Sequence, residues 1–187
     1  MVIQAKMKKN ILKLNNLNLV GEFNIDNFII YGKNNKNIKI LILKYNLIDT
    51  ICVLPDELIC LDCSYNNIRE LNNLPLKLKK MTCKHNKITK FDYLPEGIEY
   101  IDCSNNNIIN LDNLPTSVIE LYCSHNNIEN LNCLPKNIII LKCSYNHITK
   151  LNNVPKNIKK ITCINDHPNN PNNPNNRLLN YTYLKKV

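Results

Sequence analysis

The sequence repeats itself every 20 residues over most of its length. Cysteine recurs six times at this spacing from Cys63 to Cys163, asparagine six times from Asn46 to Asn146, and proline six times from Pro55 to Pro155. The periods follow one another without an insertion. A fixed period of this length is typical of repeat proteins, in which each unit buries its apolar residues only against its neighbours. We therefore expect a solenoid of stacked units.

Each period contains a short stretch in which apolar and polar residues alternate, as in Leu61, Asp62, Cys63 and Ser64. This alternation predicts a short strand with one buried face, and the fixed length lets such strands stack in parallel roughly 4.8 Å apart. The rest of the period must return the chain across the convex side. About a dozen residues with a central proline are too short and too broken for a full helix, which favours extended or 3₁₀ segments.

The stretch from Leu58 to Ile68, LICLDCSYNNI, resembles the leucine-rich-repeat signature L-x-x-L-x-L-x-x-N-x-L, with Cys63 in the third leucine position. The 20-residue length and pairs such as Leu74 and Pro75 resemble the short LP-type repeats of bacterial effectors. With its asparagine and isoleucine bias, the whole is similar to leucine-rich-repeat proteins encoded by giant DNA viruses of amoebae. The resemblance covers about residues 38–168. It implies a leucine-rich-repeat solenoid, α/β by family, with a single curved parallel sheet, and it implies no particular activity.

The phase of the repeat divides the chain into four parts. Residues 1–37 keep apolar alternation but lose the phase, which predicts a basic segment with a degenerate cap repeat. Residues 38–167 form the predicted solenoid. The run PNNPNNPNN at 168–176 is typical of an extended linker. Residues 177–187 either fold back as a C-terminal cap or form a free tail, and the sequence leaves both alternatives open.

Two ladders of identical residues are predicted to hold the solenoid together. They consist of Cys63, Cys83, Cys103, Cys123, Cys143 and Cys163, and of Asn66, Asn86, Asn106, Asn126 and Asn146. Side chains of stacked strands point in parallel rather than at each other, so we expect the cysteines to act as small buried hydrophobes without disulfides. An inward asparagine amide satisfies backbone groups of the adjoining turn. Asp166, one period after Asn146, is expected to cap that column.

Several patterns that suggest chemistry fail on geometry. Cys60 and Cys63 form a C-x-x-C, but residues three apart in a strand face opposite sides. His85 and His125 lie two repeats apart, roughly 10 Å, which is too far to share one zinc ion. The serines at repeat positions lack a positioned base, and phosphate-binding, H-E-x-x-H and G-x-S-x-G motifs are absent from the sequence. We predict no catalytic residue, no metal and no cofactor, hence no enzyme.

The outward positions of the strands are those where the repeat pattern varies. In the middle of the array the varying residues are Tyr100, Asp102, Glu120, Tyr122, Ile140 and Lys142. Together they would form one patch of aromatic, charged and apolar groups, and tyrosine is a favoured anchor of protein interfaces. We predict a protein-protein interaction module that binds a protein partner through this patch on the concave face. The pattern names neither the partner nor the oligomeric state.

Two alternative functions follow from the charge of the chain and from its cysteines. The formal net charge is +9, of which residues 1–40 carry +5 and residues 171–187 carry +3, while 41–170 is nearly neutral. Basic ends of this kind favour nucleic-acid association that weakens steeply with salt. The acidic and aromatic middle argues against a nucleic-acid groove there. The third alternative is a metal or redox protein that uses the cysteine ladder.

The expected location is a reducing compartment. The sequence has no apolar run that reaches the roughly 18 residues needed to cross a bilayer, which predicts no membrane span. The opening stretch MVIQAKMKKNILKLNNLNL contains neither a continuous apolar segment nor a small-residue cleavage site, unlike a signal peptide. Nine cysteines, an odd number, also favour a reducing environment. We expect the cytoplasm, and the host cytoplasm if the protein is viral.

Overall fold

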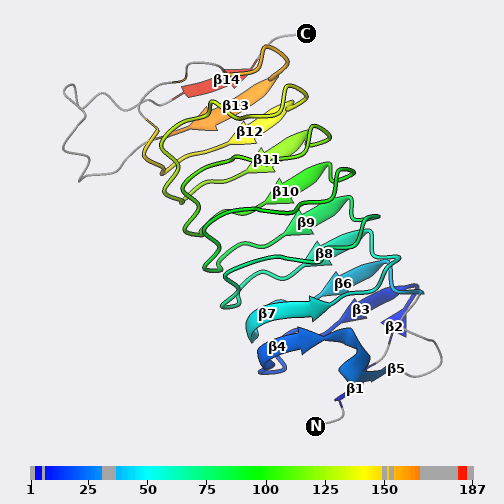
Figure 1. Cartoon of the computed structure of the whole chain (residues 1–187). Helices are drawn as coiled ribbons and strands as arrows, with labels where there is room; N and C mark the ends of the chain where they lie inside the picture. Colours follow the sequence, from blue (N-terminus) through cyan, green and yellow to red (C-terminus); the bar gives the residue numbers. More distant parts are fainter. Residues whose placement is uncertain are drawn as a thin grey trace.

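The computed structural model describes residues 3–5, 7–30, 37–148, 151, 154–164 and 181–184, with the backbone alone at 3–5, 7, 28–30 and 181–184. Its elements in chain order are β1 (Ile3–Ala5), β2 (Met7–Lys8), β3 (Ile11–Lys13), β4 (Val20–Asn24), the 3₁₀ helix η1 (Ile25–Asn27), β5 (Phe28–Ile30), β6 (Ile40–Ile42), β7 (Leu47–Val53), β8 (Cys60–Asp62), β9 (Lys80–Thr82), β10 (Tyr100–Asp102), β11 (Glu120–Tyr122), β12 (Ile140–Lys142), β13 (Lys160–Cys163) and β14 (Tyr181–Leu184). Short strands stack along one side of the molecule, and the connecting segments run along the other (Figure 1).

One ten-stranded sheet organises the molecule, in the order β14-β13-β12-β11-β10-β9-β8-β6-β3-β2. The strands from β3 to β13 are parallel to their neighbours, whereas β2 and β14 pair antiparallel at the two ends. From β6 to β13 every pairing joins residues one full period apart, such as Ile101 with Leu121. The predicted solenoid with a parallel sheet of short strands is therefore confirmed.

The inward residues of each strand form a continuous apolar core along the array. In one repeat Leu61, Cys63, Ile68 and Leu78 are all fully buried. The six ladder cysteines are fully buried as well and none of them is in a disulfide. The structure thus places all six thiols in the apolar core. A thiol suits this position because closely stacked strands leave little space between successive side chains. Cysteine is small and behaves as an apolar residue when it is buried.

The asparagine ladder ties each coil of the solenoid to the coil before it. The Nδ2 group of Asn106 donates to the carbonyl oxygens of Cys83 and Cys103, both at 3.0 Å, while its Oδ1 accepts from the backbone N–H of Ile88 at 3.0 Å. The same three bonds recur at the other predicted ladder positions, Asn66, Asn86, Asn126 and Asn146. Each of these amides thus bonds to backbone groups of two successive coils.

The return segments between strands are extended, as predicted, and contain one tight turn per repeat. In each turn the carbonyl oxygen of the repeat proline accepts from the N–H three residues later, as Pro75 does from Leu78 at 3.0 Å. Proline suits this place because it has no N–H that the start of the turn would leave without a partner. The segment η1 is a 3₁₀ helix of three residues, and Asn37 also has a 3₁₀ conformation. No described helix has the length and apolar character needed to cross a membrane.

The two ends of the solenoid depart from the repeat period. At the N-terminal end β3 pairs with β6, Ile11 with Ile40, at a separation longer than one period, and β4 and β7 form a small parallel sheet among the return segments. At the other end β14 pairs antiparallel with β13, so that Tyr181 lies opposite Cys163 in the register. The predicted capping residue Asp166 and the predicted linker 168–176 lie outside the described residues. The four-part division of the chain therefore stays a prediction.

Candidate functional site

The six outward residues predicted as a patch lie on three adjacent strands, β10, β11 and β12. Their register sets Tyr100, Glu120 and Ile140 side by side in one row. Asp102, Tyr122 and Lys142 form the next row two residues further along each strand. The fold thus places all six on one face of the sheet, because every strand is displaced by the same number of residues. We call this group the outer-face patch.

The side chains of the patch contact one another across the strands. The rings of Tyr100 and Tyr122 meet edge to face, with centroids 5.4 Å apart and an interplanar angle of 70°. The Lys142 ammonium lies 4.3 Å from the centroid of the Tyr122 ring, a cation–π distance. The Tyr122 hydroxyl donates to Glu120 Oε2 at 3.3 Å. These contacts hold two large aromatic groups in fixed orientations, which lowers the entropy lost when a partner binds.

Asp102 belongs to this face but is not available to a partner. The alternation pattern predicts an outward, exposed carboxylate, whereas the structure leaves only 6% of Asp102 exposed. Its Oδ1 accepts from the Ser104 N–H at 3.2 Å, and its Oδ2 lies 3.6 Å from the Lys84 ammonium. We attribute the low exposure of Asp102 to the large side chains next to it, Tyr100 on the same strand and Tyr122 on the adjacent strand. The side chain of Asp102 is therefore buried, and the expectation that it is exposed at the patch surface is not met.

Both patch tyrosines keep their protons at neutral pH. Partial burial, together with the nearby carboxylate of Asp102, raises the pKa of Tyr100 to about 12. Partial burial and the adjacent Glu120 carboxylate also raise the pKa of Tyr122. Their hydroxyls therefore remain neutral hydrogen-bond donors. This surface suits recognition of polar and aromatic groups of a partner rather than acid–base chemistry.

A second aromatic feature follows the strands, at a repeat position that adopts positive φ. Tyr45, Tyr65 and His85 stack in succession with ring centroids 4.4 and 4.3 Å apart, and His125 stacks on Tyr145 at 4.3 Å. His85 and His125 are exposed. The stacking was not predicted from the sequence. It could have been, because residues one period apart lie side by side in adjacent coils, and Tyr45, Tyr65 and His85 are one period apart.

Four of the buried ladder cysteines are poorly suited to thiolate chemistry. Burial raises the pKa of Cys63, Cys83, Cys103 and Cys123, so these thiols stay protonated. Cys60 lies half-buried while Cys63 is fully buried, as expected if the two face opposite sides of the strand. No group of three or more potential metal ligands occurs among the described residues.

The basic ends, on which the nucleic-acid alternative rests, are described only in part. Lys8, Lys9 and Lys13 are exposed near the first strands of the sheet. Arg177, Lys185 and Lys186 lie outside the described residues. The alternative therefore stays a hypothesis that rests on the charge of the sequence.

Comparison with solved structures identifies the architecture. The leucine-rich-repeat domain of a Shigella effector is 33% identical, with a TM-score of 0.50, over 53% of this chain and 45% of its own. The leucine-rich effector YopM of Yersinia pestis is 26% identical, with a TM-score of 0.61, over 73% of this chain and 39% of its own. The fold is a leucine-rich-repeat solenoid. No protein-family model matches the sequence, and no curated protein matches it either.

A third similar structure contains a cysteine ladder. InlJ of Listeria monocytogenes, whose functional domain includes a cysteine ladder, is 26% identical, with a TM-score of 0.56, over 76% of this chain and 34% of its own. The present solenoid has six buried cysteines at equal repeat positions. The chain spans between 34% and 45% of the length of these three proteins. The likeness is therefore one of repeat architecture.

Proposed function

We propose that this leucine-rich-repeat solenoid is a non-catalytic protein-interaction module that binds a protein partner through the outer-face patch. The observation that carries the proposal is the contact between Tyr100 and Tyr122, two half-buried rings from adjacent strands in a fixed edge-to-face arrangement. Large aromatic anchors that are rigid before binding are typical of interface hot spots. The solved leucine-rich-repeat effectors of Shigella and Yersinia support the choice of an interaction scaffold.

Each exposed part of the patch has a distinct role in this proposal. Tyr100 and Tyr122 supply the buried contact area, and Ile140 extends it on the third strand. Glu120 and Lys142 set the polarity of the rim, because each already holds Tyr122 from one side. Asp102 is buried and provides no exposed contact to the partner.

The test is affinity capture from the native cell with the wild-type chain and with the double variant Tyr100→Ala, Tyr122→Ala. We expect the double variant to lose the captured partner, since both anchors are removed, while its circular dichroism and thermal unfolding remain those of a folded solenoid. The matched control is the double variant Val20→Ala, Leu47→Ala, which removes two exposed apolar groups of β4 and β7 that belong to no part of the patch. Equal capture by the Tyr100 and Tyr122 variant and by wild type would refute the assignment of the site.

We also propose that the protein acts in a reducing cytoplasm, and that it belongs to an amoeba-infecting giant virus, in which case this is the host cytoplasm. All nine cysteines are free, and three of them, Cys52, Cys60 and Cys133, are at least partly accessible. Accessible unpaired thiols suit a reducing compartment. The viral origin rests on the compositional resemblance described above.

A further inference from the structure

Two large apolar side chains are exposed on the return segments where the repeat pattern places polar residues. Leu76 is 86% exposed and Tyr93 is 76% exposed, the two highest values among the exposed large apolar residues of the described part. At the position of Leu76 the other repeats carry Asp56, Glu96, Thr116, Lys136 and Lys156. Tyr93 stands where the adjacent repeats carry Asn73 and Asn113. The fold therefore needs neither side chain, and their exposure requires another explanation.

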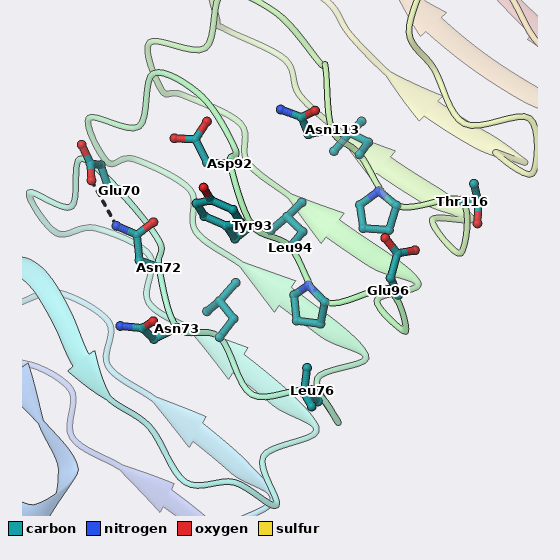
Figure 2. Close-up of a pocket in the computed structure, with 14 residues that line it drawn as sticks. Glu70, Asn72, Asn73, Leu76, Asp92, Tyr93, Leu94, Glu96, Asn113 and Thr116 are labelled. Carbon is teal, nitrogen blue, oxygen red and sulfur yellow. Dashed lines mark hydrogen bonds between the residues drawn. The ribbon is translucent and has the colours of Figure 1, made fainter.

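Leu76 and Tyr93 line the same groove, which crosses three successive repeats (Figure 2). The groove has a volume of about 950 Å³. Its buried lining is apolar and comes from the repeated Leu-Pro pairs, including Leu74, Pro95 and Pro115. Because these pairs belong to the rigid turns that precede the strands, the groove is a fixed feature of the repeat array. It lies on the side of the solenoid away from the outer-face patch.

The charge of the groove is opposite to that of the whole chain. Its lining includes the carboxylates of Glu70, Asp92 and Glu96 and no lysine or arginine. Glu70 accepts from Asn72 at 3.1 Å, and Asp92 pairs with Lys90, which lies outside the lining, at 2.8 Å. Figure 2 shows Glu70, Asp92 and Tyr93 toward one part of the groove, and Glu96 and Leu76 toward another. An acidic rim around apolar groups on a chain of net charge +9 favours one class of ligand.

We propose that this groove, separate from the outer-face patch, docks a short basic segment of a partner protein in which arginine or lysine alternates with an apolar residue. The Tyr93 ring face accepts the cationic group, with Asp92 and Glu70 beside it. Leu76 and the leucine-proline lining accept the apolar residue. The carboxylates repel phosphate groups, which argues against nucleic acid or an anionic membrane as the occupant.

The direct test is fluorescence anisotropy with a labelled hexapeptide of alternating arginine and leucine. We expect saturable binding to the wild-type chain that weakens as salt rises, since the contact is partly electrostatic. The variant Tyr93→Ala, Leu76→Ala and the variant Glu70→Gln, Asp92→Asn, Glu96→Gln should each bind about tenfold more weakly or worse, as expected when an anchor or its charged surroundings are lost. A matched hexapeptide with glutamate in place of arginine should not bind.

Two control variants isolate the site. Val20→Ala removes an exposed apolar group, and Asp49→Asn removes an exposed carboxylate, both away from the groove, and neither should change the affinity. The double variant Tyr100→Ala, Tyr122→Ala should also bind the peptide normally, which separates this proposal from the proposed function. Absence of binding to the wild type, or equal binding by wild type and both groove variants, would overturn the proposal. The substituted side chains are on the surface, so thermal unfolding should remain close to that of the wild type.

Discussion

At the scale of the residue, the buried asparagines are the costliest side chains to change. Asn106 bonds three backbone groups that belong to two successive coils. Removing its amide leaves buried donors and acceptors without partners, and each such group costs about 1–3 kcal/mol. The asparagine ladder therefore contributes to stability by satisfying the backbone as well as by filling space.

We predict that Asn106→Ala lowers the free energy of unfolding by about 2–5 kcal/mol, because at least two buried backbone groups lose their partner. Urea denaturation measures this change. The control is Asn107→Ala at the next residue, whose side chain is exposed, and which should change stability by less than about 0.5 kcal/mol. Similar losses in the two variants would show that asparagine at this turn matters for the backbone conformation rather than for the amide bonds.

Residue types that repeat were predictable from the sequence, and single residues were not. The roles of Cys103 and Asn106 follow from position alone, because a strict period gives each copy the same surroundings. Asp102 was placed on the correct face, yet its burial depends on the bulk of Tyr100 and Tyr122, which are particular to two repeats. A pattern of apolar and polar residues records which side a residue faces. It contains no information about the size of the neighbouring side chains that cover it.

At the scale of the element, neighbouring strands pair one full period apart. Residues at the same repeat position therefore lie side by side in a column, where their side chains contact one another. The stack of Tyr45, Tyr65 and His85 forms in this way, and its ring separations are close to the spacing between strands. All three residues have positive φ, between 51° and 58°. A left-handed backbone costs free energy for such side chains, and ring stacking offsets part of that cost.

We predict that Tyr65→Ala destabilises the protein by about 1–3 kcal/mol, since Tyr65 is the middle ring and stacks on both neighbours. Thermal or urea unfolding checks the loss. Tyr65→Phe keeps the ring and should retain most of the stability. If the phenylalanine variant were as unstable as the alanine variant, the hydroxyl rather than the stacking would be the stabilising group.

Elements within the period were predictable, and those at the ends were not. Each strand from β8 to β13 occupies the alternating stretch of its repeat, and the extended return segments follow from their length and proline. The pairing of β3 with β6 spans more than one period, so the repeat pattern does not indicate it. The antiparallel β14 lies beyond the last repeat, so the repeat pattern does not indicate its pairing either. At both ends tertiary pairing, rather than sequence periodicity, determines the structure.

At the scale of the whole molecule, the column of buried thiols makes the stability of the solenoid sensitive to high pH. Burial raises the pKa of Cys63, Cys83, Cys103 and Cys123 above the value of an unfolded thiol. Above about pH 8.5 the unfolded chain releases these protons while the folded chain retains them. The stabilising effect of a raised pKa is fully present below the unfolded pKa and is lost as the pH rises beyond it.

We predict that the urea concentration at the unfolding midpoint decreases when the pH is raised from 7 to 10. The decrease should be smaller in the double variant Cys83→Ala, Cys103→Ala than in the wild type. The reason is that the variant has two fewer buried thiols to ionise on unfolding. Cys133→Ala removes an exposed thiol and should leave the pH dependence unchanged. A fall that is equal in all three proteins would assign the alkaline sensitivity to tyrosine or lysine ionisation instead.

The constant displacement between paired strands also bears on how such a chain lengthens or shortens during evolution. Each repeat presents the same carbonyl, amide and apolar groups to the repeat on either side. A gene segment that encodes one complete period can therefore be duplicated or deleted and leave matching groups at the new junction. The two surfaces differ in this respect. The outer-face patch and the acidic groove each extend over three repeats, so a gain or loss inside either one would divide its residues and create a different specificity on an unchanged scaffold.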